Sequence, residues 1–408
     1  MELPNRDAEG EGLSARHLLV ILLARTTLNT AHRIIYPFLP SLARGLGISL
    51  TAASQLITLR LVAGLAAPVI GPMVERHSRR RVMEFALVLF AIGSLLLMTG
   101  GSWIAAAIAL SLYGLAKVLY DPTVQAYVGD TVPYARRGRV MGLLELSWSS
   151  AWLLGVPATG FLIDRLGWRA PWAALCGLAL LSLIATRLGL PPGRRAGDPG
   201  RQHKPIPALL QAWKSALRHR GVGSVLAASL LMTVAIETPF IVYGAWLETS
   251  FGLSLTTLGL ASIVVGLAEA AAEMGTTLFT DTLGKRRSVL LGLLTLAGSL
   301  ALLPWLADKG LVAALTGVVL MMLTFEFSIV SLLPLASELV PEARATLFSL
   351  NATAFSVGRI GGAILGGYLW QWGGSGILSN ALAGALCALL AAGCIARGTA
   401  EIEIPGKR

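Results

Sequence analysis

Twelve runs of mostly apolar residues follow one another along the chain, separated by shorter polar segments. A helix of about 20 apolar residues crosses the ~30 Å hydrocarbon core of a bilayer. The pattern therefore predicts twelve transmembrane helices and an all-α membrane protein. The predicted spans lie at residues 18–40, 50–74, 82–100, 103–128, 140–163, 170–188, 222–246, 255–279, 288–306, 311–338, 346–371 and 376–396.

The longest polar segment between two spans separates the sixth from the seventh. Residues 191–220 read PPGRRAGDPGRQHKPIPALLQAWKSALRHR, with Pro and Gly breakers first and a basic amphipathic stretch after them. This pattern predicts an N-terminal six-helix bundle at residues 1–190, a cytoplasmic linker at 191–220 and a C-terminal six-helix bundle at 221–408. The second part of the linker is expected to lie as a helix on the membrane surface.

Composition and charge agree with a multi-pass membrane protein. Hydrophobic residues make up 55% of the chain and charged residues 13%, with a mean hydropathy of +0.70, whereas soluble domains carry about 25% charged residues. Twenty-four of the 33 basic residues lie on one side of the predicted topology and four in loops on the other. The positive-inside rule then places both termini on the cytoplasmic side of an inner or plasma membrane. The net charge of +11 is thus explained without nucleic acid.

The two halves of the chain repeat one another at an offset near 205 residues. Four short matches occur in the same order, which indicates a duplication of the kind found in secondary transporters. The matches are Tyr36-Pro37-Phe38 with Thr238-Pro239-Phe240, Gly47-Ile48-Ser49-Leu50 with Gly252-Leu253-Ser254-Leu255, Glu75 to Arg81 with Asp281 to Arg287, and Asp130 to Arg136 with Glu338 to Arg344.

The loop after the second span, GPMVERHSRRRV at residues 71–82, resembles the signature of the major facilitator superfamily of transporters, of the drug and sugar-efflux permease type. Glu75 replaces the usual Asp and Ser78 the usual Gly; the second copy keeps Asp281 and Gly284 but has Thr277 where the first Gly is expected. The resemblance implies two pseudo-symmetric six-helix bundles. It also implies a gating role for residues of both copies, in which the loop steadies one access state. The residues with this implied gating role are Gly71, Glu75, Arg76, Arg79, Arg80, Asp130, Arg136, Asp281, Gly284, Lys285, Arg286, Glu338 and Arg344. The alternative is solvated loop charges, since exposed ion pairs contribute only ~0–1 kcal/mol.

Ionisable residues inside the predicted spans are candidates for the substrate and proton pathway, because each costs at least ~2.5 kcal/mol at bilayer depth on insertion scales. Four of them are expected either to form an ion-pair cluster joining the first, fourth and fifth spans or to take part in gating or substrate contact; these are Arg25, Lys117, Asp121 and Glu145. The other candidates are Arg33, Arg60, Glu237, Glu269, Glu273, Glu326 and Arg359. Arg359 and Glu326 are expected to lie close enough to pair.

Glu269 or Glu273, alone or as a coupled pair, is predicted to carry the transported proton; the alternative is that one bonds a neighbouring helix and the other reaches the cytoplasmic interface. The two residues lie one helical turn apart, in a half whose only intramembrane cation is Arg359. Glu237 and Glu326 are the competing carriers. Elsewhere in this half, the small residues Gly358, Gly362 and Gly366 recur every four positions and are expected to form a sliding contact between the bundles.

Together these features predict a secondary active transporter that exports small amphipathic molecules by alternating access, in exchange for protons. The segment Gly155 to Gly160 resembles the Gly-Pro signature of exporters, although Val156 interrupts it. The alternatives are an uptake or facilitated carrier for a sugar or other small solute, and a transporter of lipid-like substrates. We expect a monomer in the lipid bilayer, with no cofactor, no metal site and no enzymatic activity, since no H-E-x-x-H, G-x-S-x-G or Walker motif occurs.

Overall fold

The computed structural model describes residues 13–65, 77–191, 206–219, 221–339 and 344–398, and all regular structure in these ranges is helical. The first half contains α1 (Ala15–Leu46), α2 (Leu50–Leu65), α4 (Arg79–Thr99), α5 (Trp103–Thr131), α6 (Tyr134–Ser150), the π-helix η2 (Ala151–Gly155), α7 (Val156–Leu166) and α8 (Ala170–Gly189). The short helix α9 (Ile206–Leu217) follows. The second half contains α10 (Val222–Phe240), α11 (Tyr243–Phe251), α12 (Leu255–Ala261), α13 (Ile263–Leu283), α14 (Lys285–Ala307), α15 (Leu311–Leu339), α16 (Arg344–Trp372) and α17 (Leu378–Gly398).

These helices occupy the twelve spans that the hydropathy pattern predicts, so the predicted fold class is confirmed. Within the described residues, ten helical runs are long and apolar enough to cross a bilayer, and α2 and α16 fill the remaining two positions. Three spans are broken into consecutive pieces: α6–η2–α7, α10–α11 and α12–α13. The domain boundaries at residues 190 and 220 stay a prediction.

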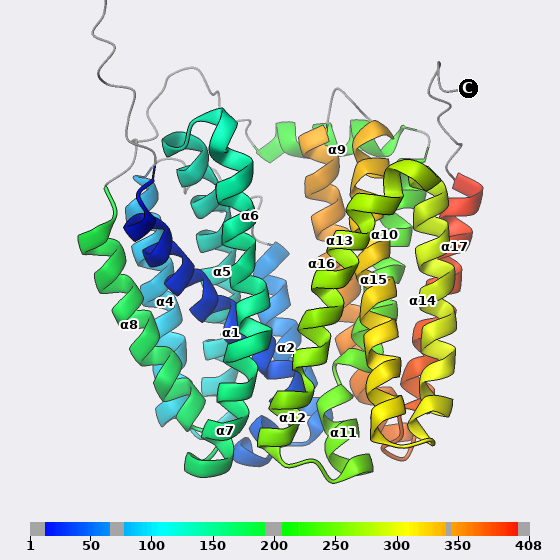
Figure 1. Cartoon of the computed structure of the whole chain (residues 1–408), viewed down its shortest axis with the longest axis horizontal. Helices are drawn as coiled ribbons and strands as arrows, with labels where there is room; N and C mark the ends of the chain where they lie inside the picture. The colour runs from blue at the N-terminus through cyan, green and yellow to red at the C-terminus, as the bar shows by residue number, and fades with distance from the viewer. Residues whose placement is uncertain (1–12, 66–76, 192–205, 220, 340–343, 399–408) are drawn as a thin grey trace, which may run out of the picture.

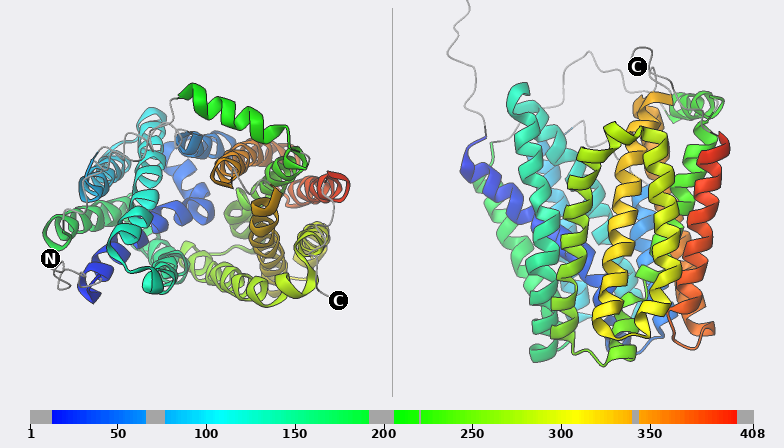
Figure 2. Two further views of the ribbon diagram at one scale, coloured as in Figure 1. Left: turned by 90° about the horizontal axis from the view of Figure 1, so that it is seen from above. Right: turned by 45° about the vertical axis from the view of Figure 1, so that its right-hand side comes forward.

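The helices run roughly parallel between two ends of the molecule (Figure 1). The start of α1, the ends of α8 and α17 and the transverse helix α9 lie at one end, which we call the linker end (Figures 1 and 2). The short helices α7, α11 and α12 lie at the other end (Figure 1). We call it the closed end because the two halves are in direct contact there. At the linker end α9 packs on α10 and α16.

Proline residues lie at the breaks in three spans, the first, the fifth and the seventh. Pro37 and Pro40 sit inside α1, whose backbone leaves helical geometry at Phe38 (φ −104°, ψ 17°), because proline donates no backbone hydrogen bond and its ring crowds the preceding turn. The matching Pro239 precedes the break between α10 and α11. In the fifth span, Pro157 follows the π-helical turn Ala151–Gly155. Turns of this type are frequent at functional sites.

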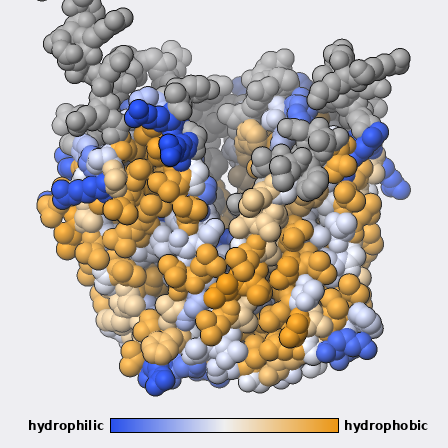
Figure 3. Space-filling model, in the orientation of Figure 1, coloured by the Kyte–Doolittle hydropathy of each residue, from blue (hydrophilic) through white to orange (hydrophobic). Residues whose placement is uncertain are grey.

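The outer surface is apolar around the middle of the molecule and hydrophilic at both ends (Figure 3). Large apolar side chains such as Leu154, Leu302 and Leu389 are exposed on it. Exposed apolar surface of this extent is stable in contact with lipid rather than water. The chain is therefore a multi-pass membrane protein.

The glycines of α16 pack inside the second half. A Cβ atom at Gly362 would lie 2.7 Å from the Cβ of Glu237, and one at Gly366 would lie 2.4 Å from the carbonyl oxygen of Thr238, both on α10. Gly358 also faces α10. The expectation that these three glycines form the contact between bundles is wrong, because the close helix pair that they allow is α10–α16.

Candidate functional site

A cluster of charges joins α1, α5 and α6 in the first half. Nη2 of Arg25 lies 3.0 Å from Oε1 of Glu145, and its Nε lies 3.7 Å from Oδ1 of Asp121. Nζ of Lys117 donates to Oδ2 of Asp121 and to Oδ1 of Asn29, both at 2.7 Å. The structure thus brings together the four residues of the predicted ion-pair cluster. Asn29 was missed, since a single buried amide gives no signal in a hydropathy pattern.

Arg33, two turns further along α1, forms an ion pair across the two halves. Its Nη2 lies 2.7 Å from Oε2 of Glu269 on α13, and the indole N–H of Trp152 on η2 donates to the same oxygen at 3.1 Å. The cation that pairs with Glu269 therefore comes from the first half. The side chain of Glu273 lies outside the described residues, so the predicted carboxylate pair stays a prediction.

Two tryptophans surround the Arg33 guanidinium. Its central carbon lies 4.5 Å from the ring centre of Trp148 and 4.9 Å from that of Trp152. Nζ of Lys117 lies 4.3 Å from the same Trp148 ring. Cations within about 6 Å of an indole ring centre are attracted to it. The fifth span therefore supplies an aromatic lining for positive charge, and the π-helical turn lies at Trp152.

A second group of charges joins α1, α2, α10 and α16. The Arg60 guanidinium donates to the carbonyl oxygen of His32 at 2.9 Å and to the hydroxyl of Tyr36 at 3.4 Å. Arg359 lies 3.5 Å from Oε2 of Glu237, and Oε1 of Glu237 is buried without a hydrogen-bond partner. Arg359 is thus paired with a carboxylate of its own half.

The ion pair that the structure gives Arg359 is with Glu237, and the predicted pairing of Arg359 with Glu326 stays a prediction. Among the described residues, no group of three His, Cys, Asp or Glu side chains is arranged to hold a metal ion.

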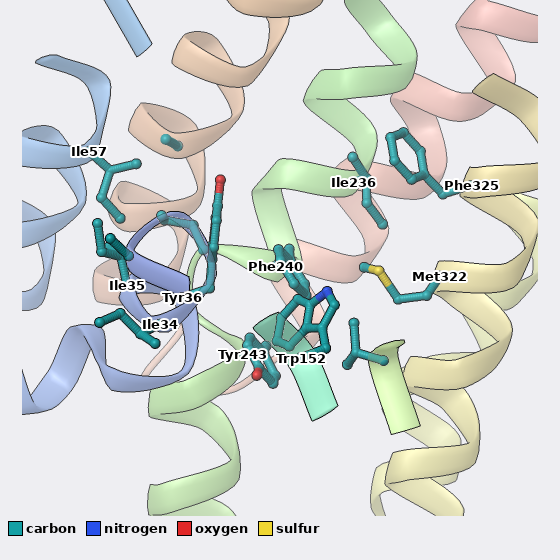
Figure 4. Close-up of a cluster of buried hydrophobic side chains, with 14 of the residues drawn as sticks. Ile34, Ile35, Tyr36, Ile57, Trp152, Ile236, Phe240, Tyr243, Met322 and Phe325 are labelled. Carbon is teal, nitrogen blue, oxygen red and sulfur yellow. The ribbon is translucent and has the colours of Figure 1, made fainter. Parts of the chain in front are cut away.

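Aromatic side chains from both halves pack next to these charges (Figure 4). The ring of Phe240 lies 4.8 Å from that of Tyr36 and stacks on Tyr243 at 4.9 Å, and it meets Trp152 edge-on at 6.2 Å. All four side chains are buried. They pack between the halves beside the breaks in α1 and α10.

Beyond this aromatic cluster the two halves meet backbone to backbone. A Cβ atom at Gly244 would lie 2.1 Å from the carbonyl oxygen of Pro37, and one at Gly160 would lie 2.3 Å from that of Leu255. Only glycine permits such an approach without displacing the partner. The halves are therefore in direct contact at the end that carries α7, α11 and α12.

Polar contacts reinforce the closed end. Oδ2 of Asp164, on α7, accepts hydrogen bonds from the backbone N–H of Thr256 at 2.7 Å and from its hydroxyl at 2.5 Å. Arg44 and Glu248 form an ion pair at 2.9 Å. Both contacts link the first half to the second, which is why we call this end closed.

At the linker end, by contrast, the described loop motif residues pair within their own half. Nε of Arg79 lies 3.3 Å from Oδ2 of Asp130, and Lys285 forms an ion pair with Glu338 in the matching position of the second half. Both pairs are partly exposed. The basic loop and the carboxylate at the end of the fourth or tenth span therefore do come together, once in each copy.

Two more arginines of the motif cap helix ends in matching positions. Arg80 donates to the carbonyl oxygen of Leu190 at 2.9 Å, and Arg286 donates to that of Ala396 at 2.8 Å. Arginine side chains satisfy the unpaired carbonyls that end a helix. The duplicated motif thus ties each basic loop to the last span of its own half.

The other motif residues are placed as follows. Arg136 is exposed in the first turn of α6, and Gly284 has a φ of 87° just before α14. Gly71, Glu75, Arg76 and the side chains of Asp281 and Arg344 lie outside the described residues. The gating role stays a prediction.

At the linker end the surface has a hollow (Figure 3), and two of the intramembrane charges are partly exposed. Figure 3 shows the surface hollowed between the two groups of helices at this end. The side chain of Glu145 is 49% exposed and that of Arg359 31% exposed, although both lie within helical spans. These two charges are therefore not sealed inside the protein.

Comparisons with known proteins agree with this geometry. The sequence profile of the Major Facilitator Superfamily matches residues 21–245 and again residues 225–407. The uncharacterized MFS-type transporter YwfA of Bacillus subtilis is 26% identical over 67% of this chain and 66% of its own length. Multidrug resistance protein 2 of the same organism is 22% identical over 83% of this chain and 84% of its own length.

Among solved structures, a bacterial homolog of the human lysosomal transporter Spinster, in an inward-facing and unoccupied conformation, superposes with a TM-score of 0.76. It shares 14% sequence identity, and the match covers 93% of this chain and 95% of that one. With twelve spans, a duplicated loop motif and two matches to the family profile, this chain belongs to the major facilitator superfamily of membrane transporters.

Proposed function

We propose that the protein is a monomeric, proton-coupled secondary transporter that exports small amphipathic molecules by alternating access. The observation that carries the proposal is the ion pair between Arg33 and Glu269, which joins the two halves inside the membrane. Protonation of Glu269 and its charge pairing with Arg33 exclude one another. Binding of a proton therefore changes a contact on which the relative position of the halves depends.

Glu269 suits the role of proton carrier better than Glu237. The Glu269 side chain is 11% exposed, whereas that of Glu237 is 1% exposed. A transported proton has to be taken up from water and released to it. Glu237 is surrounded by Tyr36, Arg60 and Arg359, which suits a fixed structural charge.

The direction of transport rests on two further arguments. The excess of basic residues at the linker end favours a cytoplasmic linker end in an inner or plasma membrane, so the described arrangement is open to the cytoplasm. The likeness to a multidrug resistance protein supports export of amphipathic molecules. In this proposal the loop motif steadies the alternative state, in which the linker end is shut.

The orientation is tested by cysteine labelling. Cysteines introduced by Ser78→Cys and by Gly284→Cys should both react with an impermeant maleimide only from the cytoplasmic side, because both positions precede helices that start at the linker end. Labelling of either position from the outside would overturn the proposed orientation.

Transport is tested in energised membrane vesicles against a panel of amphipathic cations, anions, sugars, nucleosides and lysolipids, with and without a protonophore. We expect gradient-driven movement of an amphipathic compound that the protonophore abolishes. Glu269→Gln, alone and together with Glu273→Gln, should lose gradient-driven transport but retain substrate exchange, since Gln keeps the shape and cannot ionise. Asp308→Asn, an exposed surface change, serves as the control. Gradient-driven transport by the double Gln variant would contradict the proposal.

A further inference from the structure

We infer that Arg33 is an internal occupant of a binding site for an organic cation, formed by Trp148, Trp152 and Glu269. The inference rests on the proposed transport function and narrows its amphipathic substrates to those that carry a positive charge. In the described state the guanidinium of Arg33 takes the place that the charged group of such a substrate would occupy.

The surroundings of the Arg33 guanidinium have the three parts that recognise an organic cation. Two indole rings lie 4.5 and 4.9 Å from its central carbon. The carboxylate of Glu269 supplies the opposite charge at 2.7 Å, and the indole N–H of Trp152 orients it. Aromatic rings around a counter-charge are the usual means of binding guanidinium and quaternary ammonium groups.

The contacts of the Arg33 guanidinium are those of a group that a substrate cation can displace, not those of a fixed structural ion pair. Strong arginine–carboxylate pairs are bidentate, whereas a single Nη2–Oε2 contact joins Arg33 to Glu269, and Nε of Arg33 is buried without a hydrogen-bond partner. The side chain of Arg33 is 14% exposed and that of Glu269 11% exposed. Both partners are therefore partly accessible.

This arrangement gives a physical reason for exchange of substrate against protons. An entering cation and a proton compete for the same carboxylate, so binding of one disfavours binding of the other. The cations acting on Glu269 are Arg33 from α1 and Arg359 from α16. An anionic substrate would behave in the opposite way: it would bind Arg33 itself and would be favoured when Glu269 is protonated.

The test is equilibrium binding to the purified full chain in lipid nanodiscs at constant pH, with two probes of similar shape and opposite charge, benzylguanidinium and phenylacetate. Arg33→Gln should bind benzylguanidinium at least tenfold more tightly than the parent, because the internal competitor is gone. Arg33→Lys should give a smaller gain, since its compact ammonium covers the rings less completely. Adding Glu269→Gln to Arg33→Gln should remove the gain, and adding Trp148→Leu should reduce it about fivefold.

Two controls accompany the measurement. Arg165→Gln removes an arginine that stacks on a ring at the surface, that of Phe161, and should leave binding at the parent level. Thermal unfolding of each variant establishes that it is folded, and Arg33→Lys keeps the charge of the pair if Arg33→Gln is too unstable to measure.

Two results would overturn the inference. One is a folded Arg33→Gln variant, or Arg33→Lys in its place, that binds benzylguanidinium no more tightly than the parent. The other is a parent that binds phenylacetate and an Arg33 variant that loses it. Neither result touches the proposed transport function, which is tested by gradient-driven transport in vesicles of the parent protein.

Discussion

The two ends of this transporter are held together in different ways. At the closed end the contacts join one half to the other: Gly244 lies against Pro37, and Asp164 accepts hydrogen bonds from Thr256. At the linker end the described motif residues bind within a single half, as Arg79 does with Asp130. In the proposed alternating-access cycle, this difference corresponds to a state in which the halves are joined at the closed end.

The duplication preserved some contacts in both halves and not others. The in-half anchors occur in both copies, with Arg80 and Arg286 each capping the last helix of its half. The cross-half contacts between intramembrane charges have no such repeat: Arg33 meets Glu269, whereas Arg359 meets Glu237 within the second half. Among the described residues, the arginine anchors within each half are repeated, whereas the ion pair of Arg33 with Glu269 between the halves is not.

The largest expected effect comes from breaking the closed end at its backbone contact. Gly244→Leu would place side-chain atoms where the carbonyl oxygen of Pro37 now lies, 2.1 Å from the position of Cβ. Overpacking costs ~1–3 kcal/mol, which corresponds to a shift of about 5- to 150-fold away from the closed arrangement. A cysteine introduced by Tyr243→Cys into this variant should become reactive to an impermeant maleimide from the outside, and transport should fall about tenfold or more.

The matched control is Gly223→Leu in the first turn of α10. A Cβ atom at Gly223 meets no other atom within 4 Å, so transport should stay within about twofold of the parent. Equal losses in both variants would mean that added side-chain bulk in this span is harmful wherever it is placed.

A smaller effect is expected from Asp164→Asn. The amide keeps one acceptor oxygen but loses the charge that strengthens both hydrogen bonds to Thr256. Because the contact is exposed, we expect a shift of only about three- to fivefold toward opening, measured as faster labelling of a cysteine introduced by Leu255→Cys. Asp308→Asn, at the same end but without a contact to the first half, should have no effect. An unchanged labelling rate in Asp164→Asn would show that this pair does not hold the end shut.

The smallest effect is expected at the linker end. In the proposed gating role the loop motif steadies the state in which the linker end is shut. Asp130→Asn and Glu338→Gln each remove one partly exposed pair of this motif, so in that role each should shift the balance about two- to fivefold toward the state that is open at this end. The measurement is the distance between spin labels at Leu188 and Leu283, two exposed positions at this end, with membrane insertion checked by expression level. A shift in the opposite direction would contradict the proposed gating role.

The sequence predicted the parts of this structure that depend on local pattern. The twelve spans follow from apolar run length. The breaks in α1 and α10 lie at the repeated segments Tyr36-Pro37-Phe38 and Thr238-Pro239-Phe240, although no break was predicted there. The approach of Arg79 to Asp130 and of Lys285 to Glu338 was implied by the family signature. These features require only short-range chemistry or a known motif.

The contacts that carry the proposed mechanism were not predictable in this way. Arg33 and Glu269 are 236 positions apart, and their meeting depends on how the two halves pack. The same limit explains why Gly358, Gly362 and Gly366 were wrongly expected to form a contact between the bundles. Small residues every four positions predict that a helix packs closely on another helix, but not which one. The π-helical turn at Trp152 also has only an indirect signal, the proline at position 157.

The most direct test of the account measures both ends in one experiment. Spin labels are attached to a chain in which Cys176, Cys387 and Cys394 are replaced by Ser. One pair of labels, at Leu166 and Val312, spans the closed end, and a second pair, at Leu188 and Leu283, spans the linker end; all four positions are exposed. Distances are recorded by pulsed electron resonance in nanodiscs at pH 5 and pH 8, in the parent and in Glu269→Gln.

We predict that, in the parent, the change of pH moves the two distances in opposite directions, one end separating as the other draws together. In Glu269→Gln both distances should be independent of pH, because the residue no longer binds a proton. Distances that change in the same direction at both ends, or a Glu269→Gln variant that responds to pH as the parent does, would contradict the proposal that protonation of Glu269 drives alternating access.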